Sequence, residues 1–381
     1  MRILMLNYEY PPVGGGAGVI SRHIAEGLAG KGHDVHVLTG YYKGCEVSSV
    51  KNKVQITRLA SKRKYLYKSN PYEMLSWIRM AKKFLRQHLA KHRYDLCFAH
   101  FALPGGEVAY SMKLKYDMDY VVMSHGHDIP WFFPKQMLFY HMFTYGWIKQ
   151  IVIKSKALFV QSDDMEKNAA LFLGKRYKHL LHQIPNGWDT AYFYPDETKR
   201  SENFEIVFPG RLVKQKDPFS LLKAIELIKD RIPGLHLRVL GDGPMRTSME
   251  KWVKRHNMTK FVSFEGWQET QTMRDAYQSA WMVVLPSLNE GMSMATMEAI
   301  ACGTYVIVTD VSRNAQLIEP GVNGDLVPPQ DVKALAGKIK SFYDDKFRKA
   351  YKIPASAIDK LDDTYSWDTV VSLYDDVLEK I

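Results

Sequence analysis

The first 40 residues restrict the possible folds more than any other part of the chain. They contain an apolar run at 2–7, a glycine-rich segment at 14–18, and apolar residues at helical spacing from 19 to 29. Gly32-His33 ends the predicted helix, and an alternating run at 34–39 follows. A strand, a helix and a strand in this order form the unit from which parallel α/β sheets are built.

The rest of the chain continues this pattern in two series. A length of 381 residues exceeds one ordinary core and favours two domains. The turn signal Pro185-Asn186-Gly187 and the polar residues 195–203 separate the series, which predicts Rossmann-like α/β domains at 1–195 and 204–364. Ligands of such domains bind in a cleft at the C-terminal ends of the strands. Further strands are predicted at 96–99, 120–124, 157–161, 205–208, 236–240, 262–264, 282–285 and 305–308.

Composition limits the compartment. The three cysteines, Cys45, Cys97 and Cys302, are far apart and form no CxxC pair, so neither a disulfide framework nor a zinc site is expected. The N-terminus does not resemble a signal peptide, and lysines interrupt the longest apolar region, 131–159. These features favour a cytoplasmic protein.

The strongest chemical signal lies between residues 286 and 303. A predicted strand enters a turn, and a helix starts near Ser293, where free backbone N–H groups favour a phosphate. Glu290 and Glu298 are eight residues apart, up to ~12 Å along a helix. That span suits a nucleoside diphospho-sugar with its diphosphate over the helix start. For this pair alone, the alternative is two unrelated surface glutamates.

Two more loops are expected at the same sheet edge. Arg211 and Lys216 follow the first strand of the second domain, where two cations could neutralise a diphosphate. A solvated basic loop is the alternative interpretation. The segment 241–244, which contains Gly243, is a tight turn after the next strand and is a weak signal alone.

Taken together, these segments resemble the family 4 retaining glycosyltransferases of the GT-B fold, over nearly the whole chain. The paired-glutamate motif, Glu290 with Glu298, is the most specific match. The other matching segments are Gly15-Gly16, Gly32-His33, Ser124-His125-Gly126-His127-Asp128, Ile184-Pro185-Asn186-Gly187, Arg211 with Lys216, and Ser366-Trp367.

The resemblance implies a role for each matching residue. Residues 365–381 would form a C-terminal helix that packs back on the first domain. The catalytic set would be His125, near the reacting carbon, with Glu290 on the donor sugar and Arg211 and Lys216 on the departing diphosphate; His127 is the rival histidine. Donor binding would use Gly15, Gly16, Gly243, the backbone amides of Met292, Ser293 and Met294, and Glu298 on the ribose hydroxyls.

The sequence departs from the family pattern in two places. Met292 replaces the usual phenylalanine, a change between apolar residues. Where the family has a glycine pair and then a glutamate, this chain has Arg313 and Gln316, which leaves their effect on the donor loop open.

The expected mechanism uses no cofactor and no metal. Asp117-Met118-Asp119 spells a metal motif but precedes a strand, so it is interpreted as a solvated turn. Cations and a helix terminus can do the electrostatic work of a metal on the diphosphate. No nucleophile suggests a covalent intermediate; by resemblance, transfer retains the anomeric configuration, and the leaving phosphate takes the acceptor's proton.

The basic charge is confined to the first half of the chain. Residues 1–195 carry a net charge of +13, whereas the remainder carries −2. The segments 51–68 and 79–93 hold much of this charge, and an aromatic stretch lies at 131–133. Such a surface favours an anionic membrane and a lipid-linked or oligosaccharide acceptor; a solvated face with a buried aromatic loop is the alternative. The predicted membrane and acceptor residues are Lys82, Lys83, Arg86, Trp131 and Phe132.

These expectations define the predicted function and its competitors. The prediction is a hexosyltransferase that uses a nucleotide sugar, by family frequency a UDP-sugar, in polysaccharide or glycolipid assembly on the inner face of the cytoplasmic membrane. A sugar-nucleotide epimerase or phosphorylase on the same double fold is the alternative. A nucleic-acid binder is suggested by the sequence pI of about 9.2, but no RNP, KH, zinc-finger or helix-turn-helix signature supports it. The donor sugar, acceptor, linkage and oligomeric state stay open.

Overall fold

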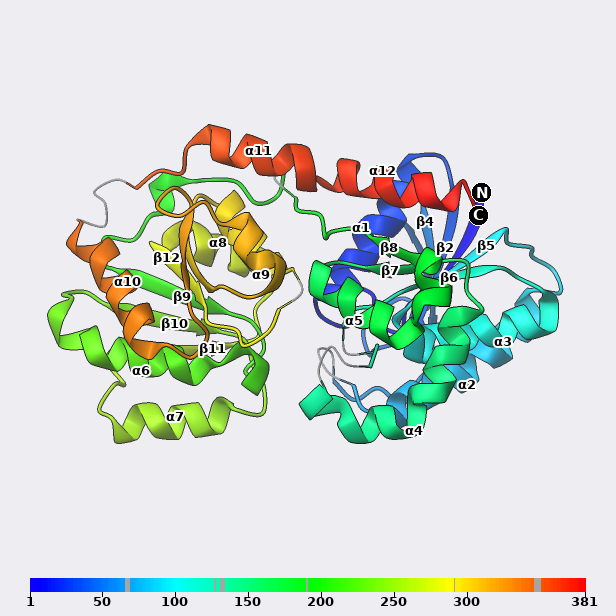
Figure 1. Cartoon of the computed structure of the whole chain (residues 1–381), viewed down its shortest axis with the longest axis horizontal. Coiled ribbons are helices and arrows are strands. Elements are labelled where there is room, and N and C mark those ends of the chain that lie inside the picture. Colours follow the sequence, from blue (N-terminus) through cyan, green and yellow to red (C-terminus); the bar gives the residue numbers. More distant parts are fainter. Residues whose placement is uncertain (66–68, 127, 131–133, 190, 291, 346–350) are drawn as a thin grey trace. The chain divides into compact units, whose positions relative to one another are not determined.

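A computed structural model describes the chain except residues 66–68, 127, 131–133, 190, 291 and 346–350, and gives only the backbone of 134–139 and 312–314. The chain forms two compact units (Figure 1). Unit 1 contains Met1–Gly187 together with Trp367–Ile381, and unit 2 contains Trp188–Ser366. Each unit is a largely parallel sheet covered by helices, so the predicted α/β architecture is confirmed.

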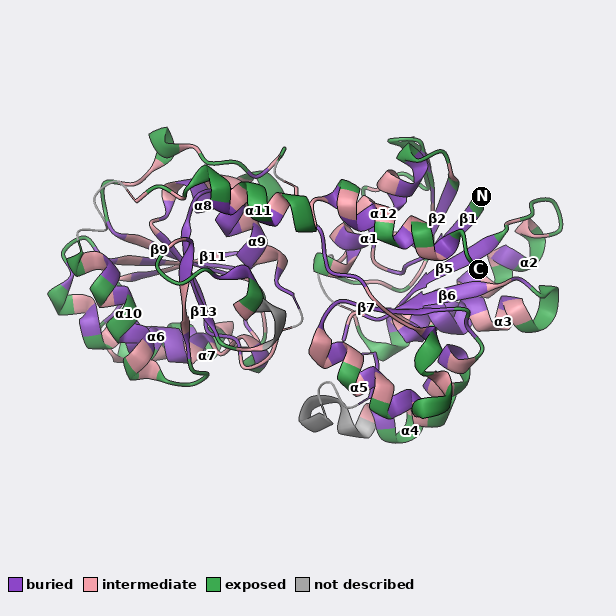
Figure 2. Cartoon of the chain, turned by 45° about the horizontal axis from the view of Figure 1, so that its top comes forward, coloured by how far each residue is buried: buried purple, intermediate pink, exposed green. Residues whose placement is uncertain are grey.

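The sheet of unit 1 has the strand order β3-β4-β2-β1-β5-β6-β7-β8. Every neighbouring pair is parallel except β3 and β4, which are antiparallel. The buried strands form the centre of the unit (Figure 2). Their bounds are β1 Arg2–Leu6, β2 Asp34–Gly40, β3 Ser48–Lys51, β4 Val54–Leu59, β5 Leu96–His100, β6 Tyr120–Met123, β7 Leu158–Val160 and β8 Leu181–Gln183.

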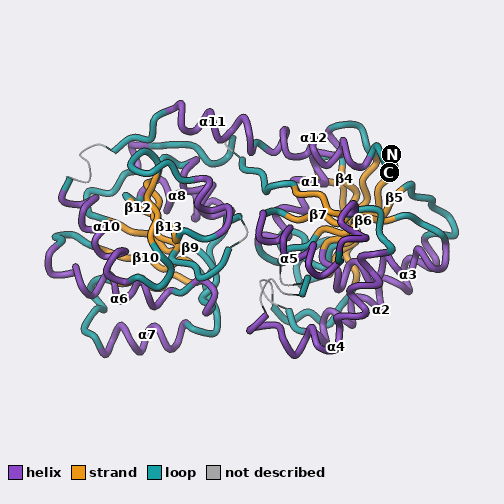
Figure 3. Tube along the Cα trace, viewed as in Figure 1, coloured by secondary structure: helices purple, strands orange, loops and turns teal. Residues whose placement is uncertain are grey.

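Helices cover both faces of this sheet (Figure 3). Alternation along β1 explains why: Leu4 and Leu6 enter the core shared with helices α2 to α5, while Ile3 and Met5 are equally buried but lie outside that core. The helices of unit 1 are α1 Gly16–Gly30, α2 Pro71–His88, α3 Glu107–Tyr116, α4 Pro134–Ile153, α5 Asp163–Leu173 and α12 Trp367–Leu378, with short helical turns η1 Phe101–Gly106 and η2 Lys175–Leu180.

The last helix, α12, packs into unit 1 beside α1. The ring centroid of Tyr374 lies 6.0 Å from that of Phe98 and 5.0 Å from that of Phe159, both on the sheet. Gly27 of α1 faces Val371 so closely that an added Cβ would lie 2.5 Å from its methyl group. The predicted return of the C-terminal helix to the first unit is therefore observed.

Unit 2 contains a six-stranded parallel sheet in the order β11-β10-β9-β12-β13-β14. Helices α6, α7 and α10 share one core with it, and α8 and α9 share another. The bounds are β9 Glu205–Pro209, α6 Pro218–Ile228, β10 His236–Leu240, α7 Arg246–Arg255, β11 Val262–Gly266, α8 Thr270–Ser279, β12 Met282–Leu285, α9 Met294–Ala301, β13 Tyr305–Thr309, β14 Gly324–Val327, α10 Val332–Asp344 and α11 Ala355–Tyr365.

The change from unit 1 to unit 2 occurs earlier than the polar segment 195–203 suggested. The units divide between Gly187 and Trp188, and that segment belongs to unit 2. The Arg200 guanidinium donates to the Gly303 carbonyl, and the Trp281 indole donates to the Ser201 carbonyl at 2.8 Å. The segment is polar because it lies on the surface, yet hydrogen bonds between side chains and backbone carbonyls fix it there.

Each sheet has one topological switch point, between β1 and β5 in unit 1 and between β9 and β12 in unit 2. The loops that leave these strand pairs diverge at the C-terminal edge of the sheet, which is where ligands bind in open α/β sheets. Within the described residues, no helix combines the length and the apolar character needed to cross a bilayer.

Candidate functional site

The switch point of unit 2 joins two loops that the sequence singled out. Residues 210–217 follow β9, and residues 286–293 follow β12. The backbone N–H of Leu288 donates to the Gln215 carbonyl at 2.8 Å, and the Gln215 amide donates to the Asn289 carbonyl at 2.9 Å. These bonds fix the two loops side by side.

Lys216 and Glu290 form an ion pair across this junction. The Lys216 ammonium donates to Oε2 of Glu290 at 2.5 Å, and each side chain is 13% exposed. Arg211, in the same loop, is exposed and has no hydrogen bond or ion pair from its side chain within the described residues. Of the three cations on the loop after β9, Lys216 is paired with Glu290, whereas Arg211 and Lys214 are exposed.

The glycines after β10 allow this loop to approach. A Cβ at Gly243 would lie 2.5 Å from the Leu212 carbonyl oxygen, and one at Gly241 would lie 1.9 Å from that of Gly210. The Leu212 N–H donates to the Asp242 carbonyl at 3.0 Å. Gly243, predicted to bind the donor, therefore has a packing reason to be glycine.

Helix α9 begins where the sequence placed a helix start. Ser293 is its N-cap and accepts from the Thr296 N–H, which leaves the amide of Met294 at the first turn without an intrahelical partner. Met292 is buried beside it, filling the position of the family's phenylalanine. Gly291 lies outside the described residues.

Glu298 lies on the second turn of α9 in an environment that disfavours charge. The Tyr277 hydroxyl donates to its Oε2 at 3.2 Å. Burial raises the pKa of Glu298 to about 7, and the bond from Tyr277 opposes this only in part. The carboxyl is therefore poised between its two protonation states near neutral pH.

The glycine-rich loop lies at the switch point of unit 1, and its glycines differ in their surroundings. Gly14 has φ +102°, and a Cβ at Gly18 would lie 3.1 Å from the Val13 carbonyl oxygen, so the backbone itself requires these two. Gly15 and Gly16, the predicted donor-binding pair, are exposed and have nothing within 4 Å of an added Cβ. Open space therefore lies over the start of α1.

Two arginines that sequence reasoning placed in a membrane-binding segment instead bind residues 9–11, which lead into this loop. Arg58 is 5% exposed, and its guanidinium donates to the carbonyls of Tyr10 and Pro11. The Arg63 side chain is 2% exposed and pairs with Glu9 at 3.4 Å. Their position in a basic run gave no sign of burial, because the partners lie 47 to 54 positions earlier in the sequence.

His125 follows β6 at the same edge of the unit 1 sheet. His125 is half-buried, and its Nε2 lies 3.1 Å from Nδ1 of the buried His100. Burial lowers the pKa of His125 to about 3, so the ring is neutral at physiological pH. Its rival, His127, lies outside the described residues. Sequence reasoning missed His100, whose signal was its place at the C-terminal end of β5.

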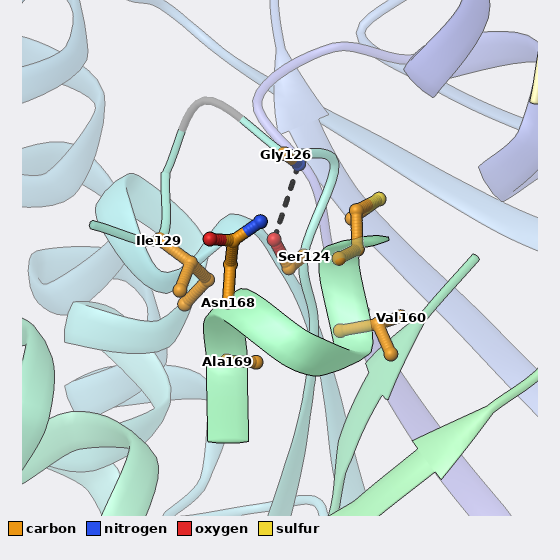
Figure 4. Close-up of a pocket in the computed structure, with 7 residues that line it drawn as sticks. Ser124, Gly126, Ile129, Val160, Asn168 and Ala169 are labelled. Carbon is orange, nitrogen blue, oxygen red and sulfur yellow. Dashed lines mark hydrogen bonds between the residues drawn. The ribbon is translucent and has the colours of Figure 1, made fainter. Parts of the chain in front are cut away.

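A small hollow lies behind the His125 loop (Figure 4). It is too narrow for a water molecule. The Gly126 N–H donates to Ser124 Oγ at 3.1 Å on one side of it. The hollow is a packing gap and not a ligand chamber. Its lining residues are Ser124, Gly126, Ile129, Val160, Met165, Asn168 and Ala169.

The predicted membrane and acceptor residues fall into three groups. Lys83 and Arg86 are exposed on α2. The Lys82 ammonium pairs with the buried Glu107 of α3, so its charge is compensated within the protein. Trp131 and Phe132 lie outside the described residues.

The remaining predictions concern a metal and the atypical donor loop. The Lys113 ammonium donates to Asp117 at 2.6 Å and to Asp119 at 2.8 Å, at the N-terminal edge of the sheet. Within the described residues, no three His, Cys, Asp or Glu side chains are grouped to hold a metal. Gln316 is exposed in the turn η6 Ser312–Leu317, and the side chain of Arg313 is not described.

Family models decide the class of protein. Residues 14–192 match the model described as Glycosyltransferase Family 4, and residues 193–358 match Glycosyl transferases group 1. The chain is a family 4 glycosyltransferase. This result favours the predicted transferase over the epimerase, phosphorylase and nucleic-acid-binding alternatives.

Individual relatives agree with the family. Glycogen synthase of Mycobacterium tuberculosis is 25% identical over 393 residues, covering 98% of this chain and 93% of that protein. The structure of sucrose-phosphate synthase from Thermosynechococcus elongatus matches with a TM-score of 0.84 at 21% identity, covering 100% of this chain and 98% of its own. Anabaena HepE with UDP and glucose matches with a TM-score of 0.79 at 18% identity, covering 100% of both chains. These two structures show the fold, which is the predicted GT-B class.

Proposed function

We propose that this family 4 glycosyltransferase moves a hexosyl group from a UDP-sugar to a lipid-linked or saccharide acceptor, with retention of configuration and without a metal ion. The ion pair between Lys216 and Glu290 at the unit 2 switch point carries the proposal. The UDP and glucose in the structure of HepE, a protein of the same fold, support the choice of donor.

In this proposal, Lys216 and Glu290 contact different parts of a bound donor. The diphosphate brings negative charge to Lys216 and Arg211, and the start of α9 adds the positive end of its dipole. Glu290 then loses its partner and accepts hydrogen bonds from sugar hydroxyls. Fixed cations of this kind stabilise the departing diphosphate in the transition state, which is the work a metal does elsewhere.

The neutral state of His125 limits how protons move. A ring with a pKa of about 3 is not an imidazolium acid at neutral pH. We therefore assign the acceptor's proton to the leaving group. The acceptor oxygen bonds to the anomeric carbon, the bond from that carbon to the phosphate oxygen breaks, and the acceptor's hydroxyl proton passes to the departing phosphate on the same face.

Donor binding and product analysis test the proposal directly. A nucleotide that binds only the folded protein raises the free energy of unfolding, by about 2.7 kcal/mol at one hundred times its Kd. UDP should raise the Tm more than ADP or GDP, in EDTA as in magnesium. NMR of the product should show the donor's anomeric configuration. An inverted product, or activity lost in EDTA, contradicts the respective part of the proposal.

One surface of unit 1 supports a membrane-bound acceptor. Helix α4 exposes apolar side chains, with Phe143 80% and Met142 63% exposed. It meets α2 at Glu107, which accepts from the Trp147 indole at 2.6 Å and from Lys82. Apolar side chains beside basic ones are typical of proteins that lie on anionic bilayers. The α2/α4 surface consists of Arg79, Lys83, Arg86, Met142, Phe143 and Trp147.

Vesicle sedimentation tests this surface. The protein should sediment with vesicles containing anionic lipid at low salt and less so at high salt. Phe143→Ser and the double variant Lys83→Glu/Arg86→Glu should each release it. Leu227→Ser removes a side chain that is 52% exposed on α6 and is the matched control. Equal sedimentation of all variants contradicts the assignment.

A further inference from the structure

The histidine pair of unit 1 assigns a role to a residue that touches no ligand. We propose that His100 is a positioning residue that holds His125 as its Nδ1–H tautomer, so that His125 offers a hydrogen-bond donor to the sugar. The tautomer itself follows from the structure of the unit alone; only its use on a sugar rests on the proposed function.

The two histidine rings meet edge to edge in nearly the same plane. His100 is fully buried at the end of β5, with its ring centroid 5.2 Å from that of Phe98 and 5.4 Å from that of His125. The planes of the two histidines differ by 16°. The 3.1 Å contact between Nδ1 of His100 and Nε2 of His125 is therefore a hydrogen bond with one shared proton.

The surroundings of the second ring nitrogen of His100, Nε2, indicate which of the two rings donates the hydrogen bond. No described residue pairs with its Nε2, which is shielded from solvent. If His125 were the donor, the proton of His100 would sit on this Nε2 and form a buried N–H with no acceptor. Such groups are rarer in folded proteins than acceptors that lack a donor. The proton of His100 therefore sits on Nδ1 and is donated to His125.

Accepting this hydrogen bond determines the tautomer of His125. A neutral imidazole carries one N–H, so when Nε2 of His125 is the acceptor, the ring's own proton is on Nδ1. No described residue hydrogen-bonds to that Nδ1. His125 therefore offers a donor to a sugar hydroxyl, and it cannot take a proton through the same atom.

The surrounding backbone holds the pair in place. Asp128 accepts from the His125 N–H at 2.9 Å and from the Ala102 N–H at 2.7 Å, which ties the loops after β6 and β5 together. Phe101 has φ +65°, an unfavourable conformation for a bulky residue, and its ring lies 4.5 Å from that of His125. Burial also lowers the pKa of His100 well below the usual range, which agrees with a neutral pair.

The tautomer can be read without any substrate. In protein labelled with ¹⁵N-histidine, long-range ¹H–¹⁵N correlation distinguishes a protonated Nδ1 from a protonated Nε2. We expect Nδ1–H for both His100 and His125 in the nucleotide-free protein, assigned with His100→Leu and His125→Ala. A spectrum with the His125 proton on Nε2 overturns the proposal, whatever the protein's activity.

Kinetics test whether the arrangement matters for transfer. His100→Leu removes the donor, and His100→Asn places an amide N–H near the position of Nδ1. We expect kcat to fall about tenfold or more in His100→Leu, as for loss of one positioned hydrogen bond, and to recover partly in His100→Asn. The KM for the donor should change less. If kcat falls equally in both variants and in proportion to the fall in Tm, His100 has a structural role only and the proposed positioning role is wrong.

Discussion

The two switch points use opposite kinds of chemistry on similar scaffolds. In unit 2, a lysine and a glutamate of opposite charge meet across the junction between β9 and β12. In unit 1, His100 at the end of β5 and His125 after β6 form a neutral pair, and the nearby Arg58 donates to backbone carbonyls just before the glycine loop. Under the proposed function, the charged site of unit 2 suits the charged diphosphate, whereas the neutral histidine pair of unit 1 suits an uncharged sugar hydroxyl.

The comparison also separates two uses of glycine. After β10, Gly243 is required because the neighbouring backbone occupies the space of a side chain. At the start of α1, Gly16 borders on empty space. The first glycine serves the fold, and the second is free to serve a ligand.

The largest expected effect concerns the charged pair of unit 2. If both groups act in the transition state as proposed, Lys216→Ala and Glu290→Gln should each reduce kcat by about 10²-fold or more. Circular dichroism should show an intact fold. Lys214→Ala removes an exposed charge from the same loop and should leave kcat unchanged.

The double variant sharpens this prediction. If Lys216 and Glu290 act as a unit, the double variant should lose less than the product of the two single losses. Near-normal turnover in both single variants would instead show that the pair is structural, and the contrast between the two switch points would disappear.

The next effect concerns Glu298 and its pKa of about 7. An ionised carboxylate accepts stronger hydrogen bonds from ribose hydroxyls than a protonated one. We therefore expect UDP affinity to fall as the pH drops below 7, and Glu298→Gln to weaken binding about tenfold at pH 8. Isothermal titration across pH 5.5–8 measures both. The variant cannot titrate at this position, so it controls for the protonation of the phosphate itself.

The same substitution should stabilise the fold. The folded state holds the Glu298 proton between pH 4.5 and about 7, where the unfolded chain has released it, so stability falls as the pH rises through this window. Above pH 7 the full penalty is present, up to about 3 kcal/mol and less where water reaches the carboxyl. Glu298→Gln should raise the Tm at pH 8 and change it little at pH 4. A lower Tm at pH 8 would contradict the raised pKa.

The smallest effect on activity distinguishes the two glycines. Gly16→Ala should keep or slightly raise the Tm, since alanine favours helices, and should raise the donor KM several-fold if a ligand approaches that surface. Gly243→Ala should instead lower the free energy of unfolding by about 1–3 kcal/mol. The interpretation fails if the two variants behave alike in thermal denaturation.

Much of the fold could be predicted because its central strands are short apolar runs. The predicted strand at 236–240 coincides with β10, and the helix start near Ser293 coincides with the N-cap of α9. The strands β3 and β4 were missed. They lie toward one edge of the sheet, and residues such as Ser48, Gln55 and Arg58 hide their periodicity.

The candidate site was predictable only where it depends on local motifs. Lys216 and Glu290 each follow a strand in a recognisable loop, so their neighbourhood could be expected from the topology. Neither the partner of His125 nor the partners of Arg58 can be seen in this way. Their contacts join segments that are distant in sequence, and the spacing of residues carries no record of which buried groups meet.

The return of α12 to unit 1 makes unit 2 an insertion within it. Residues 188–366 are continuous and could be expressed alone, whereas unit 1 needs a new junction between Gly187 and Trp367 to be complete. During synthesis, the whole of unit 2 leaves the ribosome before the helix that covers Gly27 and Phe98. The N-terminal unit therefore stays incomplete, with part of one face of its sheet uncovered, until residues 367–381 have been synthesised.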